Sequence, residues 1–293
     1  MIRIEIGRRN YLLYLLLPHR LKSRLLTPAS RAKLDRINRA FNETIYSGAG
    51  ASAYDRIHRY AEDEQHEYPA RPLVAEVWPE GGYGRALEVG AGSGYFTTLI
   101  ARHARRVIAL EPVPDMQEVL KARCRAEGVD NVEVLGVPAA ELPAVVPAAS
   151  VDTAFIIQSL HHLHDRDRVF EALGRIVRPG GRLLMVEPHH NLRRAARLFR
   201  KYLGEYRARA WWSDERNWAT HDFLTRGELR SLCRIGGFES PRFSGYWIPY
   251  SRRLIQDPAR RFLLERRIGR WPVFRHWAAV LAVEARRGSV ERW

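Results

Sequence analysis

A glycine run flanked by acidic residues is the part of the sequence best suited to bind a ligand. The run Gly90-Ala-Gly-Ser-Gly94 follows a short apolar segment, Glu88 precedes it, and Glu111 ends the next apolar segment. Glycines let the backbone turn tightly and let a ligand approach without a Cβ in the way. A carboxylate at Glu88 suits a cationic amine, and one at Glu111 suits the two hydroxyls of a ribose, because carboxylates accept hydrogen bonds. NAD-binding proteins carry a similar loop and a similar ribose acid, so the loop alone is a weak signal.

Histidines near the ends of two later apolar segments are candidates for acid–base chemistry. His161, His162 and His164 follow the fourth segment, and His189 follows Glu187 after the fifth. An imidazole titrates near neutral pH, so His161 or His162 is a candidate general base for a hydroxyl substrate. His189, or Glu187 beside it, is a candidate substrate contact. Structural or cleft-lining roles at the first group and ordinary capping at the second stay open as alternatives. We expect no metal site, because no His-x-x-x-His spacing or cysteine pair supports one.

Strands and helices that alternate from about residue 85 must position these side chains. Such alternation implies right-handed crossovers and a parallel, doubly wound sheet. Ligands in these sheets bind beyond the carboxyl ends of the strands, which is where the glycine run, Glu111 and the histidines fall. We expect strands at 85–89, 106–110, 132–135, 151–157 and 182–186, and helices at 95–104, 114–126 and 168–177, the last stopped by Pro179-Gly180-Gly181.

Five short segments, in this order and spacing, resemble the core of the class I S-adenosylmethionine-dependent methyltransferases. They resemble in particular the broad small-molecule family of methyltransferase type 11, which includes quinone-biosynthesis enzymes. The segments cover residues 87–97, 107–112, 139–143, 160–163 and 177–183. The resemblance implies an α/β fold with a doubly wound, mostly parallel, seven-stranded Rossmann-like sheet, in which an antiparallel final strand is inserted beside the sixth. It also implies S-adenosyl-L-methionine as cofactor and S-adenosyl-L-homocysteine as product.

The same resemblance implies a set of cofactor-binding residues. Residues around the methionine end would be Glu88, Gly90, Ala91, Gly92 and Gly94; Glu111 would hold the ribose, Pro112 and Met116 would lie against the adenine, and Gln158 would line the cleft. One position departs from the family pattern. Pro138 stands where relatives usually carry an acid that bonds the adenine amino group. Either backbone groups near Ala139 serve instead, or the adenine contact is weaker.

The chain divides into three regions on its sequence pattern. We expect a helical N-terminal extension at 1–80, the cofactor-binding core at 81–190, and cap insertions with the last strands at 191–293. Within the extension, 48–52 is expected to be a flexible break, with helical spacing at Leu34 to Phe41 and again at 54–60. Within the last region, Thr225 and Glu228 form a capping-box pattern that predicts a helix to Cys233, ended by Gly236-Gly237. Further strands are expected at 241–243 and 278–285.

The formal net charge of +15 comes almost entirely from arginine. It favours anionic partners such as nucleic acid or acidic lipid headgroups, or else describes a solvated basic surface. The apolar run Tyr11 to Leu17 is too short to span a membrane, and either lies on an anionic bilayer or packs on the domain. The two cysteines form no disulfide framework, which favours a reducing compartment. We therefore expect a cytoplasmic protein, with peripheral membrane contact left open.

Aromatic residues in the last region suggest how an acceptor is bound. Trp211-Trp212 lies in the segment expected to cap the substrate, and indicates either an apolar pocket or a hydrophobic hinge. Trp247, Trp271 and Trp277 lie in a second, arginine-rich insertion, which suits a membrane surface, a lipid substrate or a solvated helix face. The acceptor is therefore expected to be small and lipid-like or aromatic.

The expected reaction is an SN2 transfer of a methyl group to oxygen or carbon of that acceptor. Two other classes stay open as alternatives. An NAD-dependent oxidoreductase would need a second catalytic apparatus, of which the sequence gives no sign. A nucleic-acid methyltransferase that modifies base nitrogens would carry Asn/Asp-Pro-Pro-aromatic where Gln158-Ser-Leu-His161 stands, and no nucleic-acid-binding motif is present, so we expect no nucleic-acid partner. The oligomeric state is left open.

Overall fold

The computed structural model describes residues 46–51, 68–77, 82–163, 165–196 and 224–289. Several expectations therefore lie outside the described residues. These are the helical spacing at Leu34 to Phe41 and at 54–60, the apolar run Tyr11 to Leu17, His164, and Trp211-Trp212.

A seven-stranded sheet forms the centre of the molecule, with strand order β3-β2-β1-β4-β5-β7-β6. Strands β1 to β5 are parallel, and β7 runs antiparallel to both β5 and β6. The mostly parallel Rossmann-like sheet with its inserted antiparallel strand is thereby confirmed. The strands are β1 Arg85–Val89, β2 Arg106–Leu110, β3 Val132–Leu135, β4 Val151–Ile157, β5 Val177–Pro188, β6 Phe238–Tyr246 and β7 Val280–Arg287.

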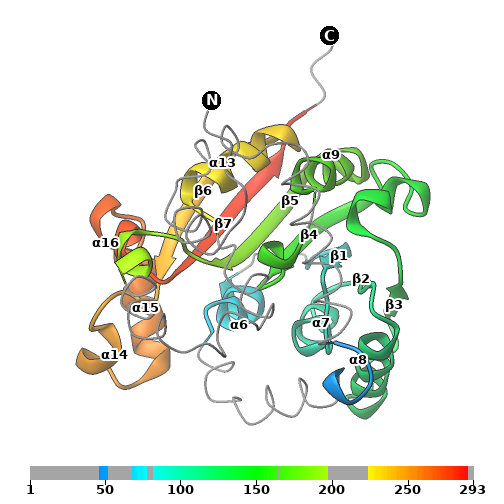
Figure 1. Cartoon of the computed structure of the whole chain (residues 1–293), viewed down its shortest axis with the longest axis horizontal. Coiled ribbons are helices and arrows are strands. Elements are labelled where there is room, and N and C mark those ends of the chain that lie inside the picture. The colour runs from blue at the N-terminus through cyan, green and yellow to red at the C-terminus, as the bar shows by residue number, and fades with distance from the viewer. Residues whose placement is uncertain (1–45, 52–67, 78–81, 164, 197–223, 290–293) are drawn as a thin grey trace, which may run out of the picture.

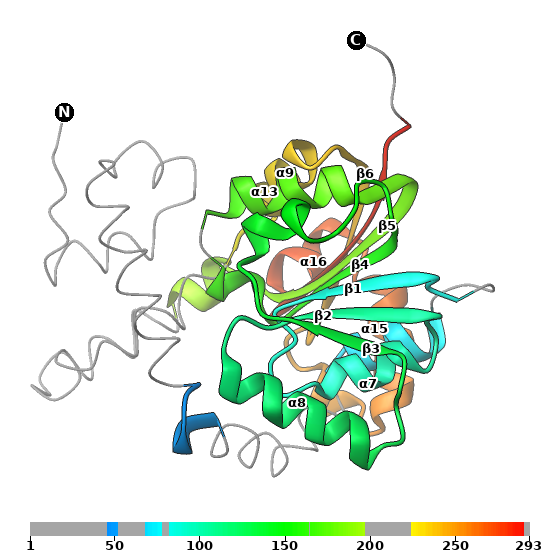
Figure 2. The same ribbon diagram turned by 90° about the vertical axis from the view of Figure 1, so that its right-hand side faces the viewer.

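Helices cover both faces of this sheet (Figures 1 and 2). One face packs on α9 and α13, which contribute Phe170 and Leu232 to the larger apolar cluster. The other face packs on α7 and α15, which contribute Ile100 and Phe262 to the second cluster. Central parallel strands are buried on both faces, which is why their sequences are mostly apolar. The helices are α6 Ala70–Pro72, α7 Tyr95–Ala101, α8 Pro114–Ala126, α9 Arg166–Ile176, α13 Arg226–Ile235, α14 Ser251–Leu254, α15 Pro258–Ile268 and α16 Pro272–Trp277, with a π-helical turn at Leu73–Val77 and 3-10 turns at Ala139–Ala144 and Leu160–His162.

The bounds of β1 to β4 and of α8 agree with the sequence-based expectation, but three others need correction. Helix α7 ends at Ala101 rather than at residue 104, and Asn131 donates hydrogen bonds to the carbonyls of Ala101 and Ala104 just beyond its end. Helix α9 begins at Arg166 because Asp165 takes a left-handed conformation immediately before it. Residues 177–181 belong to β5 and do not separate it from the helix, since Val177 pairs with Val151 before a bulge.

The expectation of a flexible break at 48–52 was wrong where the structure describes it. Residues 49–51 are helical, and Ala51 is buried against Val113 and Met116. The backbone N–H of Gly48 donates to the Asp115 carboxylate on α8. Burial against the core domain outweighs the low helix propensity of glycine here. This short segment is thereby held beside the ends of β2 and α8.

The later elements were predicted with the correct type of secondary structure, but the bounds of β6 and β7 differ from the expectation. The capping box of α13 is present: Thr225 Oγ1 accepts from the Glu228 backbone N–H, and the Glu228 carboxylate accepts from the Thr225 N–H. Strand β6 is longer than the residues 241–243 expected for it. Strand β7 is displaced by two residues from 278–285. Because β7 reverses direction, its first residue lies at the same edge as the carboxyl ends of the parallel strands.

Candidate cofactor site

The glycine loop after β1 is tied closely to the ends of the neighbouring strands. Gly90 and Gly94 have φ angles of 73° and 81°, in the left-handed region that glycine adopts without strain. A Cβ at Gly90 would lie 2.6 Å from the Cβ of Ser159, beyond the end of β4. The N–H groups of Gly90 and Ala91 both donate to the Leu110 carbonyl, the last of β2. The loop therefore bridges β2 and β4 and leaves no room for a side chain at Gly90.

Glu111 lies beside this loop at the end of β2. One carboxylate oxygen accepts from the N–H of Gly92 at 2.9 Å, and the other accepts from the N–H of Val113 at 3.0 Å. Burial raises the pKa of Glu111, and these two hydrogen bonds oppose that rise. A carboxylate offers about four acceptor sites, so both oxygens keep capacity for a ligand hydroxyl. The predicted ribose acid is thus oriented by the loop that it would serve.

Glu88 lies beneath the loop and is almost fully buried. Its carboxylate accepts a hydrogen bond from the hydroxyl of Thr97 on α7. Burial raises the pKa of Glu88 to about 8; the Thr97 hydrogen bond lowers it, and the nearby charge of Glu111 raises it further. A cationic partner would stabilise the ionised form of this buried carboxyl group and lower its pKa.

A pocket opens at this edge of the sheet and brings together most of the predicted cofactor residues. Six of them line it: Gly90, Gly92, Glu111, Pro112, Met116 and Gln158. A Cβ added at Gly92 would meet nothing closer than the Met116 methyl group at 3.8 Å, so open space lies beside this glycine. Four predicted residues do not line the pocket. Glu88 and Ala91 are buried next to it, Gly94 caps α7, and Ala139 begins a 3-10 turn within the apolar core.

Two tyrosines that sequence reasoning missed also belong to this site. Tyr46 lines the pocket. Its ring lies edge-on to the His162 ring, with the ring centres 6.0 Å apart. The pocket encloses about 120 Å³, below the roughly 300–1,000 Å³ typical of small-molecule sites. Tyr68 is buried nearby, and its hydroxyl donates to the Val186 carbonyl at 3.1 Å. Both contacts join residues far apart in the sequence, and no local pattern signals them.

His161 and Glu187 form a buried pair at the ends of the adjacent strands β4 and β5. The His161 Nδ1 atom lies 2.9 Å from one Glu187 carboxylate oxygen. The other oxygen accepts from the N–H groups of Ser159 and Leu160 at 2.8 and 2.9 Å. Burial raises the pKa of Glu187 to about 7, against those two backbone hydrogen bonds. With Glu187 ionised, the His161 proton lies on Nδ1 and the acceptor lone pair on Nε2, the arrangement of a general base. Parallel strand ends meet at one edge, which is the signal that could have paired these two residues.

The other candidate histidines fall into different surroundings. His162 lines the pocket, and its ring centre lies 4.1 Å from that of His161. His189 lies outside the pocket lining, with Nδ1 3.1 Å from the Ala278 carbonyl. Burial lowers the pKa of His189 to about 4, so its imidazole is neutral at physiological pH. Among the residues that the structure describes, no group of three or more histidine, cysteine or acidic side chains is arranged to hold a metal ion.

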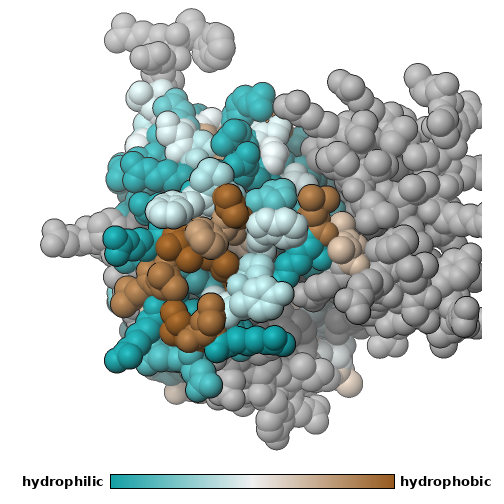
Figure 3. Space-filling model, turned by 90° about the vertical axis from the view of Figure 1, so that its left-hand side faces the viewer, coloured by the Kyte–Doolittle hydropathy of each residue, from teal (hydrophilic) through white to brown (hydrophobic). Residues whose placement is uncertain are grey.

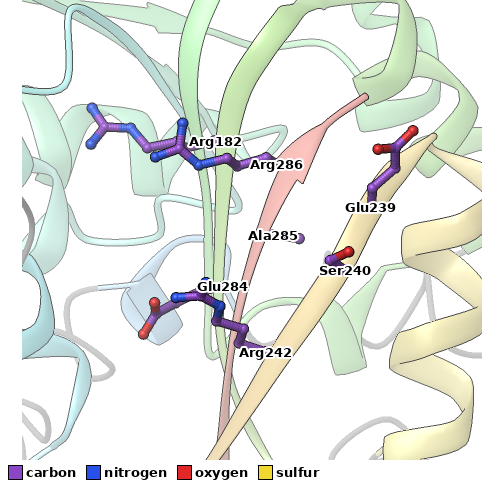
Figure 4. A pocket seen from close by; sticks show the side chains of 7 residues that line it. All are labelled: Arg182, Glu239, Ser240, Arg242, Glu284, Ala285 and Arg286. Carbon is purple, nitrogen blue, oxygen red and sulfur yellow. The ribbon is translucent and has the colours of Figure 1, made fainter. Parts of the chain in front are cut away.

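A second pocket lies at the opposite edge of the sheet, and its charges have a structural explanation. Figure 4 shows its lining residues projecting from β5, β6 and β7. Arg242 stands opposite Glu284 in the strand register, and Glu239 stands opposite Arg286. Such cross-strand pairs of opposite charge stabilise neighbouring strands. This pocket is therefore not a candidate for the cofactor.

Comparison with known proteins agrees with this geometry. Residues 87–185 match the family model of the methyltransferase domain. An uncharacterized methyltransferase of Mycobacterium tuberculosis is 36% identical over 102 residues, which cover 35% of this chain and 39% of the relative. A probable S-adenosylmethionine-dependent methyltransferase of Mycolicibacterium smegmatis is 34% identical over 157 residues, which cover 52% of this chain and 51% of the relative. The chain thus spans about two fifths to one half of the length of these curated relatives.

A solved structure extends the likeness to the whole sheet. The YcgJ protein of Bacillus subtilis superposes with a TM-score of 0.52 at 16% identity, covering 77% of this chain and 99% of that protein. At this identity the match bears on the fold alone. Over residues 87–185 the chain therefore carries a methyltransferase domain, similar to that of S-adenosylmethionine-dependent relatives.

Proposed function

We propose that the protein is an S-adenosylmethionine-dependent methyltransferase that acts on a small, lipophilic acceptor through oxygen or carbon. The observation that carries this proposal is that two buried carboxyl groups flank the glycine loop: Glu88 beneath it, which suits an ammonium group, and Glu111 beside it. The Glu111 carboxylate lies in the pocket wall, is anchored by the N–H groups of Gly92 and Val113, and keeps acceptor capacity on both oxygens. Two vicinal hydroxyls match such a carboxylate, one to each oxygen.

The residues that line or adjoin the pocket match the chemical parts of the cofactor. Open space beside Gly92 admits its ribose or amino-acid portion without a clash. Pro112 and Met116 offer apolar surface for the adenine on the far side of Glu111. When bound, S-adenosylmethionine supplies a methyl group already activated on a sulfonium, so the protein mainly aligns the acceptor and excludes water.

At the methionine end, we assign Glu88 to the ammonium group, directly or through water. The other residues of the loop, Gly90, Ala91, Gly92 and Gly94, would surround that end of the cofactor. Glu88 is held by Thr97 and buried under the loop, where an ionised carboxylate without a cation is costly. Gln158 lines the same pocket from the end of β4. The adenine contact near Ala139 stays a prediction, because Ala139 lies in the core and outside the pocket lining.

On the acceptor side, we assign His161 as the general base and Glu187 as the residue that positions it. The Glu187 carboxylate holds the Nδ1 proton of His161, so that Nε2 takes up a proton from an acceptor hydroxyl. His162 lines the pocket and is proposed to contact the acceptor. His161 and His189 both lie outside the pocket lining, and His189 is proposed only as a more distant contact because its Nδ1 atom faces the Ala278 carbonyl. A carbon nucleophile that carries no acidic proton would not need this base.

We further propose a cytoplasmic location, because the buried, unpaired cysteines Cys124 and Cys233 suit a reducing compartment. Burial raises the pKa of the Cys233 thiol to about 12, which keeps it unreactive. A small molecule rather than nucleic acid is the proposed partner at the active site.

The proposal is tested by following a labelled methyl group. The full chain is incubated with methyl-labelled S-adenosylmethionine and a total lipid and small-molecule extract of the organism that makes it, with total RNA in a parallel reaction. We expect label in the organic-soluble fraction, together with S-adenosylhomocysteine. Label found only in RNA would show that the acceptor is a nucleic acid and not a small lipophilic molecule. No transfer to either, with oxidation of added NADH, would overturn the methyltransferase proposal.

A further inference from the structure

The insertion between β6 and β7 carries an unusual concentration of exposed apolar side chains. Ten large hydrophobic side chains are exposed in the described part of the chain, and seven of them lie within residues 250–277. Leu254 is 81% exposed and Trp271 is 61% exposed. Figure 3 shows brown residues gathered among teal ones on the side of the molecule that carries α14, α15 and α16 in Figure 1. The seven are Tyr250, Leu254, Leu263, Leu264, Trp271, Val273 and Trp277.

The same insertion is strongly basic. Residues 250–277 contain eight arginines and two acidic residues, a formal net charge of +6. Glu265 is buried, and Asp257 caps the start of α15 by accepting from the Arg260 N–H. The exposed charge is therefore almost wholly positive. The exposed arginines are Arg252, Arg253, Arg260, Arg267 and Arg270.

The exposed side chains belong to a well-anchored unit. The Glu265 carboxylate accepts from the N–H groups of Trp247 and Ile248, each at 2.9 Å, and from the Ser251 hydroxyl. Phe262 of α15 stacks on Tyr246 of β6 with ring centres 5.5 Å apart. The inward positions of the insertion are thus already filled, and its remaining apolar residues face outward. They form a stable surface that a partner can bind.

This surface lies at the same edge of the sheet as the cofactor pocket. The insertion leaves β6 after Tyr246 and enters β7 at Val280, which pairs with Pro188 at the carboxyl end of β5. At the start of the insertion, the Trp247 ring packs edge-on against the Tyr68 ring, with the ring centres 5.4 Å apart. Tyr68 in turn bonds the Val186 carbonyl at the end of β5. A partner bound to the insertion would therefore lie close to the end of the sheet where ligands bind.

We propose that the α14–α16 insertion docks the protein on the surface of an anionic lipid bilayer. Tryptophan and leucine side chains insert at the boundary between headgroups and acyl chains, while surrounding arginines attract acidic headgroups. Arginine stems also cover apolar surface while their charged ends stay in water. Among the described residues, no helix combines the length and hydropathy needed to cross a bilayer. The proposed contact is peripheral because exposed side chains of the insertion make it.

Two other occupants fit this surface less well. A second copy of the chain, docked through the same surface, would bring two patches of charge +6 together, and like charges across an interface are costly. Single-stranded nucleic acid would use the aromatic rings and the arginines but gains little from Leu254, Leu263 and Val273, because bases stack on aromatic rings. A bilayer uses both the aliphatic side chains and the positive charge.

The test is vesicle flotation of the full chain, with phosphatidylcholine vesicles that either contain or lack phosphatidylglycerol. We expect binding to the anionic vesicles, at least about ten-fold weaker binding to neutral ones, and release by salt, because charge attraction is screened. The double substitution Leu254→Ser with Trp271→Ser should weaken binding to anionic vesicles at least about ten-fold. Val145→Ser, at an exposed apolar residue outside the insertion, is the matched control and should bind as the unmodified chain does.

A second variant separates charge from apolar insertion. Arg252→Glu with Arg253→Glu should lose the preference for anionic vesicles while its circular dichroism stays unchanged. Equal binding by the Leu254/Trp271 variant and the control would overturn the proposal. So would a chain that binds neither vesicle but forms a dimer, by light scattering, that the same variant disrupts. The surface is separate from the cofactor pocket, so titration of each variant with S-adenosylmethionine distinguishes failure of docking from failure of the proposed function.

Discussion

Glu111 and Leu254 lie at the same edge of one sheet, yet the first is 6% exposed and the second 81% exposed. Around β1, β2 and β4, the chain buries carboxylates and anchors them with backbone N–H groups and hydroxyls. Around β6 and β7, it buries the acidic Glu265 as an internal anchor and turns leucine, tryptophan and arginine outward.

Burial and exposure therefore distinguish two kinds of binding at this edge of the sheet. A small polar ligand is bound tightly by buried groups whose orientation is fixed before it arrives. A broad surface needs only exposed apolar area and charge of the right sign. Substitutions in the β1–β2 half are therefore expected to alter ligand affinity or chemistry, and substitutions in the insertion to alter stability or docking.

The largest effect is expected for Glu111→Ala. The substitution removes the carboxylate that we propose accepts from two ligand hydroxyls, and hydrogen bonds to a charged group contribute about 1.5–3 kcal/mol each. The affinity for S-adenosylmethionine should fall by at least about 100-fold, as measured by calorimetric titration. Glu133→Ala removes an exposed carboxylate that pairs with Arg106 on the outer strands and should leave the affinity unchanged. Similar losses in both variants would mean that Glu111 is not a ligand contact.

Glu187→Gln should lower kcat by about 100-fold for a hydroxyl acceptor, the contribution typical of a general base. A glutamine oxygen can still accept from Ser159 and Leu160, but its amide N–H would face His161 Nδ1 and force the proton onto Nε2. The KM for the cofactor should change little. Nitrogen NMR of the His161 ring should report the change of tautomer. Full activity with an altered tautomer would exclude His161 as the base.

Gly269→Ala should lower the free energy of unfolding by about 2 kcal/mol, the cost of overpacking a filled site. The new Cβ would collide with the Gly245 carbonyl, where the insertion is hydrogen-bonded to β6. Gly227→Ala is the matched control, since Gly227 is an exposed helical glycine with nothing closer than 3.8 Å to a new Cβ. That change should stabilise the protein slightly. Urea unfolding measures both variants, and equal midpoints would show that the insertion is not anchored at Gly269.

The smallest effect expected is a pH dependence of cofactor affinity. The pKa of Glu88 is raised to about 8 by burial, so below that pH its carboxyl group is mainly protonated in the free protein. An ammonium partner lowers this pKa, and binding then releases a proton. Affinity should therefore rise as pH rises, about ten-fold from pH 6 to pH 7, where both values lie below the pKa of the free protein.

Calorimetric titration of S-adenosylmethionine across this range measures the slope, and Glu88→Gln provides the comparison. In that variant the slope should largely vanish, since the titrating group is gone. A steep slope that survives the substitution would assign the proton to another group.

The core could be predicted from sequence because its signals are local. Strands β1 to β4 are short apolar runs, and the glycine loop follows directly from β1. Most of the predicted cofactor residues accordingly line one pocket. The sequence-based predictions were wrong where long-range packing determines the local structure. Residues 49–51 form a helix because they pack on α8, and Pro179-Gly180-Gly181 stays in β5 because the sheet accommodates a bulge.

The acceptor side was harder to predict for the same reason. His161 and Glu187 are separated by a helix and meet only because β4 and β5 are neighbours in the sheet. Tyr46 reaches the pocket from a segment with no recognisable motif. His189 directly follows the end of β5, but its ring bonds the Ala278 carbonyl just before β7. Polar residues at a strand end thus indicate the correct edge of the sheet without indicating which of them line the pocket.

The most direct test of the cofactor assignment is calorimetric titration of the full chain with S-adenosylmethionine and, separately, with NADH. A ribose acid beside a glycine loop serves both ligands, whereas a buried carboxyl group at Glu88 suits only one that carries an ammonium group. We predict saturable binding of S-adenosylmethionine and no detectable binding of NADH under the same conditions. Preference for NADH, or binding of neither ligand, would contradict the methyltransferase assignment.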